Sequence, residues 1–158
     1  MIQAGQPIPA VDIFEGTAEG PKPVNTGDLF GGKKSVLFAV PGAYTPTCSA
    51  QHLPGFVQHL NDFKAKGVDQ VVCMSVNDAF VMAAWGKDGG AEGITMLADG
   101  NGAFTDALGL EMDGSAFGMG KRSQRFALVI DNGTVSHVFV EEPGAFEVSS
   151  AEHVLSNL

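Results

Sequence analysis

Cys48 lies in the stretch PGAYTPTCS at residues 41–49, where an apolar run gives way to Pro, Gly and Thr. Thr45 followed by Pro46 is a typical helix start, with threonine as the N-cap and proline as the first helical residue. Cys48 then falls in the first turn, where unpaired backbone N–H groups and the helix dipole favour a thiolate. The position indicates a nucleophile, although a small buried residue, the usual role of a free cysteine, fits the position equally well.

Cys73 is the only other cysteine, and it lies among apolar residues in DQVVCMSV at residues 69–76. Burial in such a strand disfavours the thiolate, so we interpret Cys73 as a core residue. Two cysteines are too few for a disulfide framework, and their spacing fits neither a CxxC redox pair nor a zinc site. The sequence thus predicts one working cysteine, no metal and a reducing compartment.

His52 follows Cys48 by four residues, which places both near one face of the helix. It could act as the base of a cysteine hydrolase. A helix histidine bonded to backbone or solvent is the simpler interpretation, because no neighbouring Asp or Asn would orient the ring.

Short apolar runs alternate with segments of helical period along the chain. Four runs are apolar at several consecutive positions, as in strands covered on both faces: residues 34–40, 69–76, 94–98 and 125–131. The DNG at residues 131–133 predicts a tight antiparallel hairpin before one further strand. The order β-α-β-α-β-α, then β-β-α, predicts an α/β fold: a central mixed β-sheet flanked by helices, in a single domain over residues 1–158.

The helix boundaries are predicted from capping residues. Three helices are expected: residues 77–85 with Asn77 or Asp78 as N-cap, residues 101–109 with Asn101 as N-cap, and the C-terminal tail with a capping box from Ser149 to Glu152. The Gly- and Pro-rich stretch 15–34 is interpreted as a surface connection with one helical turn near TGDLF.

The acidic composition limits the partners of the protein. The formal net charge is -9 in a chain of 158 residues, whereas a phosphate backbone or an anionic membrane requires a cationic face. No apolar run approaches the roughly 18 residues of a membrane span, and the N-terminal MIQAGQPIPAVDIFEG lacks the features of a secretion signal. We therefore expect no nucleic acid and no membrane as partner, and a cytoplasmic location.

Three separated segments resemble the peroxiredoxin 5 (type II, atypical) subfamily of thiol peroxidases. They are PGAYTPTCS with the following HLPGF, SVNDAFVM at residues 75–82, and RSQRFALVIDNG at residues 122–133. The resemblance implies a thioredoxin-like fold with an N-terminal extension. It also implies four catalytic residues: Cys48 as the peroxidatic cysteine, Thr45 as the hydroxyl bonded to sulfur and peroxide, Pro41 as the shield of the pocket and Arg125 as the arginine that completes the site. Without the motif, Arg125 would be interpreted as an exposed residue at a strand end.

The implied reaction is the reduction of hydrogen peroxide and organic hydroperoxides through a Cys48 sulfenic acid, an antioxidant role that needs no cofactor. Arg125 and the helix N-terminus would stabilise the thiolate, and Thr45, Arg125 and the Cys48 N–H would stabilise the leaving oxygen anion. Some relatives carry a resolving cysteine near the C-terminus, but residues 141–155 contain none. The chain is therefore similar to the one-cysteine members, whose reductant is an external thiol: glutathione with glutaredoxin, or thioredoxin.

Three further residues are candidates for the substrate-pocket wall or a dimer contact. Tyr44 stands where relatives more often have Phe, which adds a hydroxyl near the pocket. Phe117 and Met119 are large apolar residues in the glycine-rich GSAFGMGKR, a region that resembles part of the family's dimer contact. A homodimer is expected. The glycines of this segment do not indicate a phosphate loop, because no strand precedes them and no Lys-Ser/Thr pair follows.

Two other functions stay open at this point. In a peroxide sensor, Cys48 would be oxidised once per molecule without sustained turnover. In a cysteine hydrolase, His52 would activate Cys48 and an acyl-enzyme would form.

Overall fold

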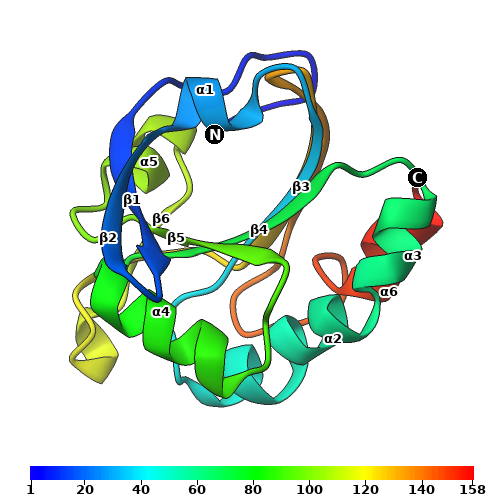
Figure 1. Cartoon of the computed structure of the whole chain (residues 1–158). Coiled ribbons are helices and arrows are strands. Elements are labelled where there is room, and N and C mark those ends of the chain that lie inside the picture. Colours follow the sequence, from blue (N-terminus) through cyan, green and yellow to red (C-terminus); the bar gives the residue numbers. More distant parts are fainter.

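A seven-stranded sheet forms the centre of the computed structural model, which describes residues 1–158 (Figure 1). The strand order is β2-β1-β5-β4-β3-β8-β9. These strands are β1 (Asp12–Thr17), β2 (Gly20–Asn25), β3 (Lys34–Ala39), β4 (Gln70–Ser75), β5 (Ile94–Ala98), β8 (Phe126–Asp131) and β9 (Thr134–Val140). A separate two-stranded sheet joins β6 (Glu111–Asp113) and β7 (Lys121–Ser123).

The helical segments connect and cover the strands. They are α1 (Thr26–Phe30), the π-helical turn η1 (Cys48–His52), α2 (Leu53–Gln58), α3 (Leu60–Ala65), α4 (Ala79–Asp88), α5 (Ala103–Leu108), the 3-10 turn η2 (Ser115–Phe117) and α6 (Ala151–Ser156). None of these helices combines the length and apolarity needed to cross a membrane.

The four apolar runs identified in the sequence correspond to β3, β4, β5 and β8. Strands β3, β4 and β5 are parallel to one another, whereas β8 is antiparallel to β3 and β9 is antiparallel to β8. The predicted mixed sheet flanked by helices is therefore confirmed. The hairpin between β8 and β9 is confirmed too: Asn132 has a φ of 49° and Gly133 a φ of 77°, as a type I′ turn requires.

The sheet separates two hydrophobic cores, because successive side chains of a strand point to opposite faces. Within β3, Phe38 belongs to one core and Leu37 to the other. In Figure 1, α2, α3, α4 and α6 cover the Phe38 face, and α1 and α5 cover the opposite face. The Phe56 ring stacks on Phe38 and on Phe63, with centroid distances of 4.0 and 5.4 Å. This stacking holds the helix that follows Cys48 against the centre of the sheet.

The stretch 15–34 contains the end of β1, the whole of β2 and α1, so its interpretation as a surface connection was wrong. The expected helical turn at TGDLF is α1. The sequence did not predict strand β2, because prolines such as Pro21 and Pro23 are unfavourable in most strands. Proline is tolerated there because β2 pairs only with β1 and lies at the edge of the sheet.

The N-cap of α5 is Gly102, one residue after the predicted Asn101, and it has no side chain to cap the helix. The buried carboxylate of Asp99, rather than Asn101, accepts hydrogen bonds from the backbone N–H groups of Phe104 and Thr105 at 3.0 and 2.7 Å. The cap of α4 is Asp78, one of the two residues expected.

The predicted capping box of α6 was displaced by one residue. Ser150 is the N-cap, and its hydroxyl accepts a hydrogen bond from the His153 N–H. Ser149 is instead buried, and its hydroxyl donates to the Glu141 carboxylate at 2.7 Å. Ser149, which the local sequence pattern predicts to be the N-cap, therefore forms a tertiary hydrogen bond instead.

Gly16 provides a test of how tightly the β1–β2 hairpin packs on α4. A Cβ on Gly16 would collide with the Ala79 carbonyl oxygen and lie 2.7 Å from the Ala83 nitrogen, both backbone atoms. We expect Gly16→Ala to lower the free energy of unfolding by about 1–3 kcal/mol, the usual cost of overpacking, in denaturant titrations. Gly55→Ala is the matched control: its Cβ would lie 3.8 Å from that of Ala151, so we expect a gain of about 0.5–1 kcal/mol from replacing a helical glycine. Equal changes in both variants would contradict this packing.

Candidate active site

Cys48 is completely buried in the first helical turn after β3. The helix begins at Pro46, as predicted, and the Ser49 N–H donates to the Thr45 carbonyl at 2.9 Å. From Cys48 the turn widens to a π-helix, in which the Leu53 N–H donates to the Cys48 carbonyl. Single π turns of this kind are frequent at functional sites.

The Thr45 hydroxyl is the first of two groups that contact the sulfur. Its Oγ1 lies 2.8 Å from Cys48 Sγ and 2.8 Å from the Gly42 carbonyl oxygen. A hydroxyl has one proton. In the thiol form, Cys48 can donate to Oγ1 while Thr45 donates to Gly42; in the thiolate form, Thr45 donates to the sulfur. The site can therefore accommodate both forms of Cys48 without moving a heavy atom.

Arg125 is the second contact, and it comes from 77 residues further along the chain, at the start of β8. Its Nη2 donates to Cys48 Sγ at 3.1 Å, and its Nη1 donates to His52 Nδ1 at 2.8 Å. The Phe146 ring lies against the same guanidinium, 5.9 Å from Cζ to the ring centroid. Arg125 is thus held by the site rather than exposed at a strand end.

His52 is a neutral acceptor for Arg125. Its Nε2 lies 2.9 Å from the Ser149 carbonyl, so Nε2 carries the proton and Nδ1 is free to accept. Burial, aided by the charge of Arg125, lowers the pKa of His52 to about 3. The bond to backbone was expected, whereas the bond to Arg125 was missed. The geometry does not support His52 as the base of a hydrolase, because its acceptor nitrogen faces Arg125 rather than Cys48.

Glu141 anchors the loop that presents the Ser149 carbonyl to His52. Its Oε2 accepts from the Glu147 N–H, the Ser149 N–H and the Ser149 hydroxyl at 2.7, 2.8 and 2.7 Å. Burial alone would raise the pKa of Glu141, but the hydrogen bonds from Ser149 and the neighbouring backbone outweigh it, so the pKa lies below its usual value. No sequence signal indicated this role, since the contacts depend on a loop conformation.

The loop before the helix is held by side chains of α4 and its N-terminal approach. The Ala43 N–H donates to Asn77 Oδ1 at 2.9 Å, and the Tyr44 hydroxyl donates to Asp88 at 2.6 Å. Tyr44 is half exposed and has a φ of 65°, a left-handed conformation uncommon for a side chain of this size. The hydrogen bond to Asp88 also raises the pKa of Tyr44.

Cys73 lies in β4, fully buried in the same core as Cys48. Burial, with a smaller contribution from Cys48, raises the pKa of Cys73 well above its usual value. The interpretation of Cys73 as a core residue is confirmed.

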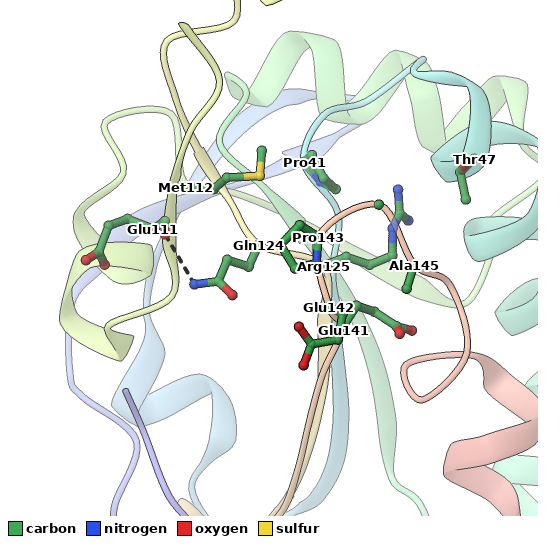
Figure 2. A pocket seen from close by; sticks show the side chains of 11 residues that line it. Pro41, Thr47, Glu111, Met112, Gln124, Arg125, Glu141, Glu142, Pro143 and Ala145 are labelled. Carbon is green, nitrogen blue, oxygen red and sulfur yellow. Dashed lines mark hydrogen bonds between the residues drawn. The ribbon is translucent and has the colours of Figure 1, made fainter. Parts of the chain in front are cut away.

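A cavity of about 400 Å³ is lined by Arg125, which contacts the sulfur, and by Thr47, which precedes Cys48 (Figure 2). Cys48 itself is buried and does not line the cavity. Of the predicted site residues, Pro41 and Arg125 line it. The other lining residues had not been predicted: Thr47, Glu111, Met112, Gln124, Glu141, Glu142, Pro143, Gly144 and Ala145. They come from the start of the helix that carries Cys48, from β6, from the approach to β8 and from the loop after β9, which the fold alone brings together.

Tyr44, Phe117 and Met119 do not line this cavity in the single chain. Met119 lies near Gly42, where its Cε would be 3.3 Å from a Cβ on that glycine. Phe117 is 84% exposed. Their assignment to a pocket wall or dimer contact stays a prediction. The chain gathers no group of three or more His, Cys, Asp or Glu side chains that could hold a metal ion.

The sequence matches the model of the Redoxin family over residues 3–155. It is 51% identical over 140 residues to Peroxiredoxin-2E, chloroplastic, of Arabidopsis thaliana, covering 87% of this chain and 60% of the relative. The chain thus spans less than two thirds of that protein. It is also 52% identical over 136 residues to Peroxiredoxin-2C of Oryza sativa subsp. japonica, covering 85% of this chain and 84% of the relative.

Two solved structures extend the comparison to the fold. Reduced Prx3 in complex with H2O2 from Vibrio vulnificus superimposes with a TM-score of 0.95 at 55% sequence identity, covering 99% of both chains. Peroxiredoxin 5 from Alvinella pompejana superimposes with a TM-score of 0.88 at 36% identity, covering 99% of this chain and 97% of that one. The thioredoxin-like fold implied by the resemblance is therefore confirmed. With a family match over nearly the whole sequence and relatives sharing about half of its residues, this chain belongs to the peroxiredoxin family.

Proposed function

We propose that the protein is a thiol-dependent peroxidase of the peroxiredoxin 5 type, which reduces hydrogen peroxide and organic hydroperoxides through Cys48 as part of antioxidant defence. The observation that carries the proposal is the pair of donors on one sulfur: Thr45 at 2.8 Å and Arg125 at 3.1 Å. Donors at that distance favour a thiolate, the form of cysteine that acts as a nucleophile. The likeness to peroxiredoxin 5 from Alvinella pompejana supports the subfamily.

In the proposed reaction, the Cys48 thiolate attacks the terminal oxygen of a hydroperoxide. An S–O bond forms as the O–O bond breaks, so sulfur loses two electrons and the peroxide gains them. The products are a Cys48 sulfenic acid and an alkoxide or hydroxide, which takes up a proton as it leaves. Thr45 and Arg125 already point at the reacting sulfur, so the same donors can stabilise the charge that develops on the leaving oxygen. Pro41, a wall of the cavity, would shield that oxygen from water.

An external thiol is proposed to complete the cycle, because Cys73 is fixed inside β4 and the chain has no third cysteine. One thiol would condense with the sulfenic acid, releasing water and forming a mixed disulfide. A second thiol would then restore Cys48 and leave as the disulfide product. Glutathione with glutaredoxin, or thioredoxin, are the proposed reductants.

The remaining proposals concern context. We place the protein in the cytoplasm as a single domain over residues 1–158 that forms a homodimer. Support for the dimer comes from two exposed aromatic side chains, Tyr44 and Phe117, at 50% and 84% exposure.

Replacing each cysteine in turn tests the assignment of the nucleophile. We expect Cys48→Ser to lower the rate of peroxide consumption with a thiol reductant by a factor of about 10³ or more, because a serine hydroxyl is not ionised at neutral pH. Cys73→Ala is the matched control and is expected to retain activity. Full activity in Cys48→Ser would refute the proposal. Rapid oxidation of one Cys48 per chain, without turnover by any thiol, would instead favour the peroxide sensor.

Thr45 can be tested with two variants that differ in the hydroxyl. Thr45→Val removes the donor to sulfur, and we expect kcat/KM for hydrogen peroxide to fall about 10²–10³-fold, the usual loss for one donor to a developing anion. Thr45→Ser retains the hydroxyl and is expected to stay within about tenfold of the wild type. Similar losses in both variants, measured by stopped-flow oxidation of Cys48, would assign Thr45 a packing role only.

His52 is proposed as a positioning residue that acts through Arg125, and its neutrality has a measurable consequence. The folded-state pKa of about 3 lies below the roughly 6.5 of an unfolded histidine. The unfolded state therefore takes up the proton first as the pH falls, and the stability present above pH ~6.5 is lost progressively towards pH ~3. We expect the wild type to lose about 2 kcal/mol more than His52→Gln between pH 7 and 5 in denaturant titrations.

His52→Gln is chosen because an amide NH2 can retain the hydrogen bond to Ser149 while the side chain no longer titrates. The raised pKa of His59, caused mainly by its hydrogen bond to Asp62, has the opposite effect but cancels in the comparison. A loss of kcat/KM in His52→Gln is expected as well. Identical pH profiles for the two proteins would show that His52 is not held neutral.

A further inference from the structure

Three carboxylates and one guanidinium border the cavity in front of Cys48: Glu111, Glu141, Glu142 and Arg125. Figure 2 shows Glu141 and Glu142 next to Arg125, with Glu111 at the far end of the cavity beyond Gln124. The side chains of Glu111 and Glu142 are exposed, and that of Glu141 is buried. The excess of negative charge raises the question of which molecules can reach the sulfur.

Arg125, the one positively charged residue that lines the cavity, already forms hydrogen bonds with other groups. Arg125 donates to Cys48 Sγ and to neutral His52. With Cys48 as a thiolate, as the proposed function requires, the charges of Arg125 and the sulfur offset each other. An incoming anion therefore meets the carboxylates without a free cation at the bottom of the cavity.

No cation forms an ion pair with the three carboxylates. The ion pairs of the chain join His59 to Asp62, His59 to Glu152 and Lys121 to Asp106, and none includes Glu111, Glu141 or Glu142. Lys121 is close enough to Glu111 for that carboxylate to contribute to its raised pKa, but the first cause is the hydrogen bond to Asp106. Glu141 is held by hydrogen bonds from neutral groups only.

We propose that Glu111 and Glu142 determine hydroperoxide specificity at this cavity by charge: they admit uncharged hydroperoxides and disfavour anionic ones. The inference rests on the proposed function, since it concerns the molecules that react at Cys48. A concave site lined by one sign of charge concentrates the field at its opening. Carboxylates several ångströms from the path of an anion are expected to slow it about threefold to tenfold at low ionic strength.

The rate of Cys48 alkylation tests whether the cavity disfavours anions, and the test does not require catalytic turnover. Iodoacetamide and iodoacetate have nearly the same size and the same leaving group, but only iodoacetate is charged. Rates at Cys48 are measured by mass spectrometry for the wild type and for the Glu111→Gln/Glu142→Gln double variant. Dividing the iodoacetamide rate by the iodoacetate rate cancels the intrinsic reactivity of the sulfur. We expect this ratio to be about threefold to tenfold lower in the double variant, and the difference to shrink in high salt.

Glu19→Gln/Glu92→Gln is the matched control, because it changes the net charge equally at exposed positions outside the cavity. Its ratio is expected to equal that of the wild type. An unchanged ratio in the Glu111→Gln/Glu142→Gln variant, or an equal change in the control, overturns the inference.

A turnover experiment separates this inference from the proposed function. The kcat/KM for a hydroperoxide carrying a carboxylate is divided by that for uncharged tert-butyl hydroperoxide, and the quotient is expected to rise about threefold to tenfold in the double variant. If the wild type turns over neither hydrogen peroxide nor tert-butyl hydroperoxide, the proposed function fails, while the alkylation ratio still decides the charge selection. If it does and the quotient is unchanged, only the charge selection fails.

Discussion

The hydrogen bond from Arg125 to Cys48 Sγ is the contact on which the site depends, because it joins two segments that share no local structure. Cys48 is placed by the end of β3 and the helix behind it, and Arg125 by the start of β8. Strands β3 and β8 are antiparallel neighbours, with Ala39 opposite Phe126. The register of this one strand pair therefore brings the guanidinium to the sulfur.

Orientation of the guanidinium requires an acceptor that carries no positive charge. His52 provides it as a neutral ring whose proton is held by the Ser149 carbonyl. Glu141 in turn accepts two hydrogen bonds from Ser149 and one from the Glu147 N–H. Each residue of this series forms a hydrogen bond with the next one, so its donors and acceptors are satisfied. A buried cluster that contains a charge, an imidazole and a carboxylate can be stable for this reason. No buried side-chain nitrogen or oxygen atom in the chain lacks a partner.

Local signals predicted the parts of the structure that local chemistry determines. Consecutive apolar residues identified the central strands, and Thr45 followed by Pro46 located the helix start that carries Cys48. The prediction failed where a tertiary contact competed with a local preference, as at Ser149, which bonds to Glu141 instead of capping α6. Arg125 was identified only by resemblance to a family, since nothing in its own neighbourhood distinguishes it from an exposed strand end. The cavity lining could not be predicted, because it is assembled from four separate segments by the sheet topology.

The position of Ser149 links the C-terminal helix to the chemistry at the sulfur. Ser149 immediately precedes Ser150, the N-cap of α6, and α6 ends two residues before the end of the chain. Segments with few buried contacts open more easily than the core, and α6 is six residues long and buries only Ala151 and Val154. Movement of Ser149 would withdraw the carbonyl that fixes the tautomer of His52, and the guanidinium would lose its orientation in turn. The geometry at the sulfur thus depends on a backbone group just before α6 that lines no part of the cavity.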